Sequence, residues 1–132
     1  MSALLKELAV IALALLVSAA AVLGLRDRGT MVPPPETVVE EFVRDLSLER
    51  WGPAHAHLSA PIADSLGPDS LAGYADALQQ RVGRIADVHG RPFFATDEAA
   101  EATAEITTEA GDRVALRFPL SREQGLWKIA RL

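Results

Sequence analysis

Hydrophobic positions along the chain follow three patterns, and the first is an uncharged apolar run from Leu8 to Leu25. These 18 residues, LAVIALALLVSAAAVLGL, would form a helix about 27 Å long at ~1.5 Å per residue, close to the roughly 30 Å hydrocarbon core of a bilayer. We therefore expect an N-terminal segment at residues 1–25 whose transmembrane helix, at 8–25, contacts the lipid bilayer.

A cleaved secretory signal peptide is the alternative interpretation of this segment. The small residues from Ser18 to Ala21 offer a cleavage site. The apolar run continues beyond them to Leu25 without a polar exit, which favours a retained anchor. A lipoprotein anchor is excluded, because it requires a cysteine and the chain has none.

A proline-rich segment, RDRGTMVPPP at residues 26–35, separates this run from the rest of the chain. Gly29 ends the predicted helix, and the three consecutive prolines favour an extended, stiff backbone. The segment is expected to act as a linker to a single globular domain at residues 36–132.

The second pattern is a helical spacing of apolar residues between the linker and Gly83. It predicts an amphipathic helix from Pro35 to Leu46, a short helix from Trp51 to Leu58, and a third helix that begins at Ser70 as its N-cap. Between the last two, the spacing allows one further turn. The apolar positions of the three helices are Val39, Phe42, Val43 and Leu46, then Trp51, Ala54 and Leu58, then Leu71, Tyr74, Ala75, Leu78 and Val82.

The third pattern is an alternation of apolar and polar residues, which predicts four strands joined by hairpins. The first strand, from Arg84 to Phe94, contains a glycine and a proline that predict a bend or bulge. The second, at residues 102–107, is ambiguous, because its alanine and glutamate residues also favour a helix. The third runs from Val114 to Leu120 and the fourth from Leu126 to Leu132.

The order of these elements predicts an α+β domain, with three helices packed on one face of a curved four-stranded antiparallel sheet. Trp127 and Ile129 lie on one side of the fourth strand and are expected to face the helices. Pro119 predicts an edge or a bulge near the end of the third strand, because proline has no backbone N–H to donate.

Three stretches carry a family resemblance: the first helix from Pro35 to Leu46, the stretch from Trp51-Gly52-Pro53-Ala54 through Leu58-Ser59, and the ending Glu123-Gln124-Gly125-Leu126-Trp127-Lys128-Ile129. Together they resemble the nuclear-transport-factor-2-like superfamily, also called ketosteroid-isomerase-like. The resemblance covers residues 34–132 and implies a cone-shaped domain behind a single N-terminal anchor. It implies no particular function, because the superfamily includes enzymes, ligand binders and inactive modules.

The charge of the chain narrows the range of partners. The net charge is −5, and the five charged residues before residue 30 sum to +1, so the domain carries −6. An acidic domain has no electrostatic surface for nucleic acid, so no nucleic-acid partner is predicted. The absence of cysteine removes disulfides, thiolate catalysis and thiolate metal sites.

Two groups of residues suggest metal binding, and neither has the required spacing. His55 and His57 are two residues apart, so on a helix they point in nearly opposite directions and cannot share an ion. The acidic residues Asp97, Glu98, Glu101, Glu105 and Glu109 lack the glycine-containing pattern of a calcium loop. No metal and no cofactor are predicted.

The superfamily resemblance implies that an enzyme of this kind would need a carboxylate base and an oxyanion donor inside the cone. Tyr74 is the only tyrosine, and it is expected to be a core residue with a satisfied hydroxyl or, failing that, to line the cone. Asp76 and Asp87 are candidate bases by elimination alone. We therefore predict no catalytic residue, and we predict Tyr74, Leu78 and Phe118 as the cone lining for a small apolar ligand.

The orientation of the anchor is not decided by its flanking charges, because Lys6 precedes it and Arg26 and Arg28 follow it. The resemblance favours a single-pass protein with an extracytoplasmic C-terminal domain. The predicted function is a membrane-anchored, non-enzymatic interaction or accessory module that acts on a membrane or envelope protein. The alternative is a small-molecule-binding or isomerase-like domain that uses the apolar cone.

Overall fold

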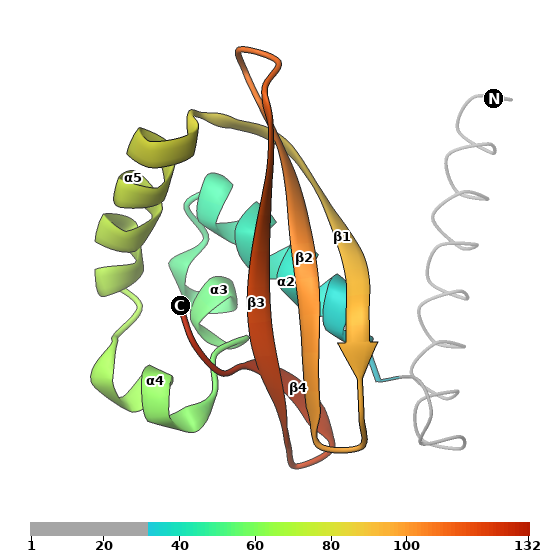
Figure 1. Ribbon diagram of the computed structural model, residues 1–132. Coiled ribbons are helices and arrows are strands. Elements are labelled where there is room, and N and C mark those ends of the chain that lie inside the picture. The colour runs from blue at the N-terminus through green and yellow to red at the C-terminus, as the bar shows by residue number, and fades with distance from the viewer. Residues whose placement is uncertain (1–31) are drawn as a thin grey trace, which may run out of the picture. The chain divides into compact units, whose positions relative to one another are not determined.

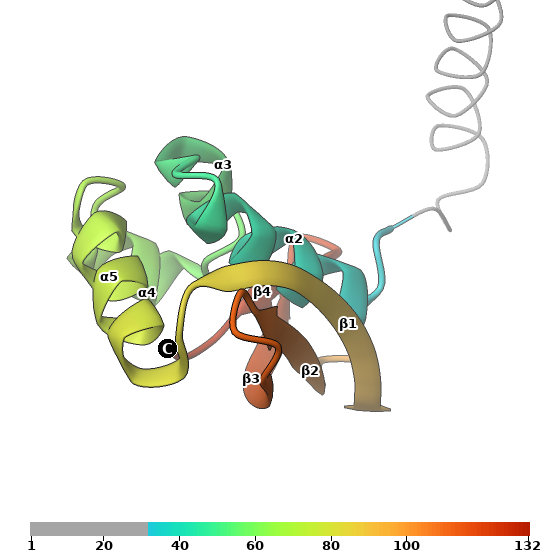
Figure 2. The ribbon, with the colours of Figure 1, turned by 90° about the horizontal axis from the view of Figure 1, so that it is seen from above.

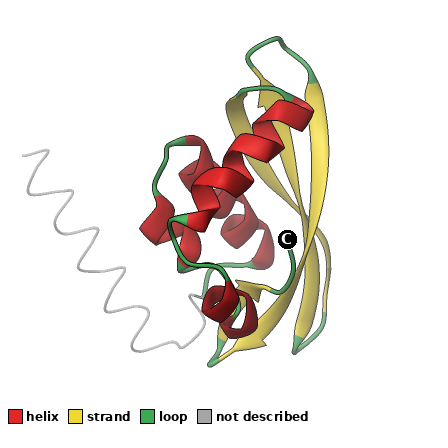
Figure 3. Cartoon of the chain, turned by 90° about the vertical axis from the view of Figure 1, so that its left-hand side faces the viewer, coloured by secondary structure: helices red, strands yellow, loops and turns green. Residues whose placement is uncertain are grey.

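A four-stranded antiparallel sheet, in the order β1-β2-β3-β4, forms one layer of the domain, and helices cover one of its faces (Figures 1 and 3). The computed structural model describes residues 32–132. The helices are α2 (Pro35–Ser47), α3 (Trp51–His55), α4 (Ala60–Ser65) and α5 (Ser70–Val82), and the strands are β1 (Ile85–Ala95), β2 (Ala99–Thr108), β3 (Arg113–Glu123) and β4 (Leu126–Ile129).

The predicted anchor at residues 8–25 lies outside the described residues, as does the linker up to residue 31. Within residues 32–132, no helix combines the length and the apolar character needed to cross a bilayer.

The α+β class and the curved four-stranded antiparallel sheet are confirmed, but the prediction of three helices is wrong, since four lie in residues 32–132. The additional helix is α4, where the sequence suggested a single turn. Its start is fixed by a distant contact, because the N–H of Ser59 donates to the carbonyl oxygen of Ile129 at 2.9 Å. Leu58 and Ile129 form a parallel bridge at the same point, so the chain is extended between α3 and α4.

The first strand has the irregularity that its glycine and proline predict. The register of β1 against β2 shifts between Ile85 and Asp87 and again between Pro92 and Phe94. The strand curls around α2, as Figure 2 shows. At the crossing, the N–H of Gly90 donates to Oε1 of Glu40 at 3.0 Å, which joins the edge of the sheet to the helix.

The ambiguous second segment is a strand, and its inner face is made of small residues. Ala100, Ala102, Ala104 and Ile106 alternate with partly exposed polar residues and are buried beneath the helices. Because β2 lies between β1 and β3, both of its edges are hydrogen-bonded, and this pairing outweighs the helical propensity of alanine and glutamate.

The core lies between α2 and the sheet. Phe42 and Leu46 of α2 are fully buried, and β4 packs against the same helix with Trp127 and Ile129 turned inward, as predicted. The fourth strand ends at Ile129 and not at Leu132, because its ladder with β3 covers only the last four residues of that strand. The rest of β3 has no strand on its second edge.

Candidate functional site: a cavity between α5 and β3

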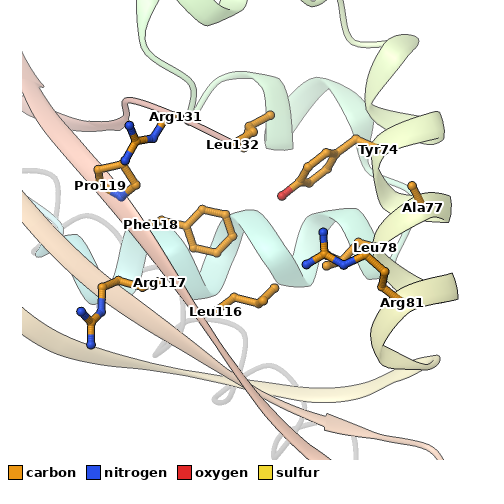
Figure 4. A pocket seen from close by; sticks show the side chains of 10 residues that line it. All are labelled: Tyr74, Ala77, Leu78, Arg81, Leu116, Arg117, Phe118, Pro119, Arg131 and Leu132. Carbon is orange, nitrogen blue, oxygen red and sulfur yellow. The ribbon is translucent and has the colours of Figure 1, made fainter.

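A cavity of about 410 Å³ opens between α5 and the part of β3 that β4 leaves uncovered (Figure 4). It exists because β4 pairs with β3 only from Leu120 to Glu123, while α5 packs against α2 and α3. Its lining residues come from α5, from β3 and from the segment after β4: Tyr74, Ala77, Leu78, Arg81, Leu116, Arg117, Phe118, Pro119, Arg131 and Leu132.

All three residues predicted to line the cone lie in this cavity. Tyr74 and Leu78 come from one face of α5, and Phe118 comes from the inner face of β3. The ring of Phe42 lies near both aromatic residues, with centroid distances of 6.4 Å to Tyr74 and 6.0 Å to Phe118. This buried ring therefore packs against an aromatic residue from each wall of the cavity.

Tyr74 is half-buried and presents a polar group to the cavity. Burial raises the pKa of the Tyr74 hydroxyl above its ordinary value of 10.0, and the positive charge of Arg81 opposes that rise. No residue of the described part accepts or donates a hydrogen bond at this hydroxyl. Tyr74 is therefore not fully buried and lines the cavity, the second of the two expectations for it, and Figure 4 shows the hydroxyl directed toward Phe118.

Every ionised side chain that lines the cavity is an arginine. Arg117 points away from the cavity (Figure 4), where it pairs with Glu101 at 3.8 Å. Within residues 32–132, neither Arg81 nor Arg131 has a carboxylate within ion-pair distance. Arg81 was not predicted as a site residue, although it follows Tyr74 by seven residues, or two helical turns, and so shares its face.

The two carboxylates considered as general bases lie elsewhere. Asp76 is exposed and accepts a hydrogen bond from Nε2 of Gln80 at 3.1 Å, and Asp87 lies on the exposed part of β1. None of the side chains lining the cavity is a carboxylate, an imidazole, a serine hydroxyl or a cysteine thiol. Its own residues can therefore bind a ligand through apolar contact, a hydroxyl and guanidinium groups, and they supply no general base or activated nucleophile.

The histidines of the second helical segment have separate partners. Nε2 of His55 lies 2.8 Å from the carbonyl oxygen of Leu66 and 3.2 Å from that of Ala63, so it holds α4. Nε2 of His57 lies 3.6 Å from Glu41 and 3.7 Å from Asp45 of α2. No set of three histidine, aspartate or glutamate side chains in the described residues is arranged to hold a metal ion.

A second feature lies on the outer face of the sheet, which the helices leave uncovered. Phe93 and Phe94 are 53% and 47% exposed, with ring centroids 5.9 Å apart. The guanidinium carbon of Arg117 lies 3.7 Å from the centroid of the Phe93 ring. The bulge between Pro92 and Phe94 brings these neighbouring rings together. We call Phe93, Phe94 and Arg117 the aromatic patch.

Comparisons with known proteins identify the class of fold. No protein-family model and no curated protein matches the chain. Among solved structures, a protein of Campylobacter jejuni provisionally named an NTF2-like transpeptidase is similar to it, with a TM-score of 0.60 and 12% sequence identity. The match covers 76% of this chain and 100% of that one. The likeness shows an NTF2-like fold, the architecture implied by the sequence resemblance, and at this identity it shows the fold alone.

Proposed function

We propose that the chain is a membrane-anchored, non-enzymatic interaction module whose NTF2-like domain is extracytoplasmic and acts on a membrane or envelope protein. The uncharged run from Leu8 to Leu25 supports the anchor. The observation that carries the interaction role is the aromatic patch, where two adjacent phenylalanines remain about half exposed beside an arginine. Aromatic and arginine side chains are enriched where proteins contact partners.

The composition of the cavity supports a non-enzymatic role. Transpeptidation proceeds through a nucleophile that is activated by a neighbouring base. The cavity offers only the hydroxyl of Tyr74, whose pKa burial raises, so that it stays protonated and is a weak nucleophile. The lining of this cavity therefore gives no support to a transpeptidase activity.

The interaction role is tested by isolating the full chain from its native membranes in mild detergent. A variant with Phe93→Ser and Phe94→Ser is compared with Leu48→Ser, which alters a similarly exposed apolar residue, 51% exposed, outside the patch. A stoichiometric membrane protein is expected with the wild type and with Leu48→Ser, and it should be absent from the patch variant. An unchanged partner in the patch variant would contradict the proposal.

The anchor and its orientation are tested on the same membranes. Carbonate washing should leave the protein in the pellet, with a mature N-terminus that precedes Leu8. A soluble form beginning near Ala21 or Val22 would show that the segment is a cleaved signal peptide. Protease added to intact cells should digest the domain, whereas digestion only after lysis would place the domain in the cytoplasm.

Small-molecule binding is the second candidate function, and the cavity between α5 and β3 favours it. Its volume of about 410 Å³ falls within the ~300–1,000 Å³ typical of ligand sites. The lining combines an apolar wall with a few polar groups, which is the usual composition of such sites.

A further inference from the structure

The charge of the cavity is opposite to that of the domain around it. The domain carries a net charge of −6, yet the cavity lining contains three arginines and no acidic side chain. Arg117 is engaged with Glu101 and Phe93 on the outer face, which leaves Arg81 and Arg131 at the cavity. The guanidinium groups of Arg81 and Arg131 favour an anionic ligand at this site.

The wall of the cavity that α5 forms carries both polar and apolar side chains. Figure 4 shows the guanidinium of Arg81 and the hydroxyl of Tyr74 both directed toward β3, where Leu116 and Phe118 form the facing wall. Tyr74 and Arg81 lie two turns apart on one face of α5, and both line the cavity. Both can donate hydrogen bonds, and a carboxylate or phosphate oxygen can accept from both at once.

We infer that this cavity binds a small molecule with an apolar body and a single anionic group, whose oxygens accept hydrogen bonds from Arg81 and Tyr74. The inference rests on the second candidate function, and it goes further by naming the class of ligand. The apolar body packs against Leu116 and Phe118, and Arg131 adds positive charge at the rim. A free carboxylic acid and the phosphate head of a lipid share this chemistry.

The chain provides its own probe for the test, because Tyr74 is its only tyrosine. The full chain, labelled with ¹³C-tyrosine and held in phosphatidylcholine nanodiscs, is titrated with 3-phenylpropionate, 2-phenylethyl phosphate or uncharged 3-phenylpropionamide. The two anions are expected to shift the Tyr74 resonance saturably. The amide has the same shape as the acid without its charge. It should bind at least about tenfold more weakly than the acid, because a charge-assisted hydrogen bond is lost.

Substitutions test which side chains donate hydrogen bonds to the anionic group of the ligand. Arg81→Gln should weaken binding of both anions by about tenfold while leaving the amide unaffected, and Arg81→Lys should recover part of the loss. Arg84→Gln is the matched control, because Arg84 is an exposed arginine outside the cavity lining and its loss should change nothing. Calorimetric titration of Tyr74→Phe should show weaker anion binding and unchanged amide binding.

Changing the lipid of the nanodiscs distinguishes the two possible sources of the anion, a free acid and a lipid head. If phosphatidylglycerol nanodiscs alone shift the Tyr74 resonance and Arg81→Gln abolishes that shift, the ligand is a lipid head; if they do not, it is a free acid. Equal affinity for acid and amide, unchanged in Arg81→Gln, would overturn the inference while leaving small-molecule binding in place. If no probe shifts the Tyr74 resonance, both the anion inference and small-molecule binding in this cavity are overturned.

Discussion

The backbone of Gly90 in β1 lies against the carbonyl oxygen of Glu36 in α2, so closely that a Cβ atom on residue 90 would overlap that oxygen. The contact lies where the curled edge of the sheet crosses the first turn of the helix. Oε1 of Glu40, one turn further along α2, accepts the N–H of the same glycine at 3.0 Å. Glycine is required here because two backbones meet, and its freedom of φ is not involved.

Gly90→Ala should therefore destabilise the domain. The added methyl group must push β1 away from α2, and overpacking of this kind costs about 1–3 kcal/mol or more. Urea unfolding of the full chain, followed by tryptophan fluorescence, measures the change. Gly73→Ala in α5 is the control, because nothing lies within 4 Å of the added Cβ. It should stabilise the helix by up to about 1 kcal/mol, and an equal effect of both changes would contradict the packing argument.

Trp127 is 8% exposed and closes the core against α2, so its removal should be costly. Trp127→Ala should reduce the free energy of unfolding by about 3–5 kcal/mol, the usual cost of emptying a large aromatic site. Leu126→Ala, one residue earlier on the opposite side of β4 and 44% exposed, should cost less than about 0.5 kcal/mol. A loss below about 1 kcal/mol for Trp127→Ala would place that side chain outside the core.

The fold was predictable where a local period decides the structure, and it was missed where a distant contact does. The apolar stripe of α2 and the alternation of β3 are strong local patterns, and both elements form as predicted. The break between α3 and α4 depends on the pairing of Leu58 with Ile129, which are far apart in the sequence. No local window contains that contact, so α4 looked like a turn.

Only the part of the candidate site that lies on local apolar patterns was predicted from the sequence. Tyr74, Leu78 and Phe118 follow from the apolar faces of α5 and β3. Leu116 and Arg81 share those faces, but an apolar pattern does not single out an arginine that lies among apolar residues. Arg131 was not predictable, because its place depends on where the ladder of β4 ends.

Tyr74 should ionise at a higher pH than a free tyrosine, because burial raises the pKa of its hydroxyl above 10.0. The folded state then holds the phenolic proton more tightly than the unfolded state. The resulting contribution to stability is complete below pH 10 and is lost as the pH rises through the folded pKa. As Tyr74 is the only tyrosine, its absorbance titration reports this group alone. A midpoint at or below 10.0 would contradict the half-buried position.

Tyr74→Phe supplies the corresponding stability measurement. At neutral pH the change should shift the free energy of unfolding by about 1 kcal/mol or less, because only one hydroxyl is lost and it has no partner within residues 32–132. Above pH 10 the variant should lose less stability than the wild type. Parallel stability curves for the two proteins would indicate that the hydroxyl is not desolvated.

His57 should make the domain less stable in mild acid. Burial, the largest effect, lowers the pKa of the imidazole below 6.5, although the carboxylates of Glu41 and Asp45 oppose it and Lys128 reinforces it. As the pH falls below 6.5, the His57 imidazole takes up a proton in the unfolded chain before it does so in the folded domain. The free energy of unfolding therefore declines until the pH passes the folded pKa.

The matched variant for this effect is His57→Gln, which cannot titrate. Urea unfolding at about pH 7.5 and about pH 5 should show a larger acid-induced loss in the wild type than in His57→Gln, since only the wild type carries the linked proton. Glu41→Gln removes a charge that raises the pKa of His57, so NMR titration of the imidazole should give a still lower midpoint in that variant. An unchanged or higher midpoint in Glu41→Gln would contradict the attraction between the ring and this carboxylate, which lies 3.6 Å away.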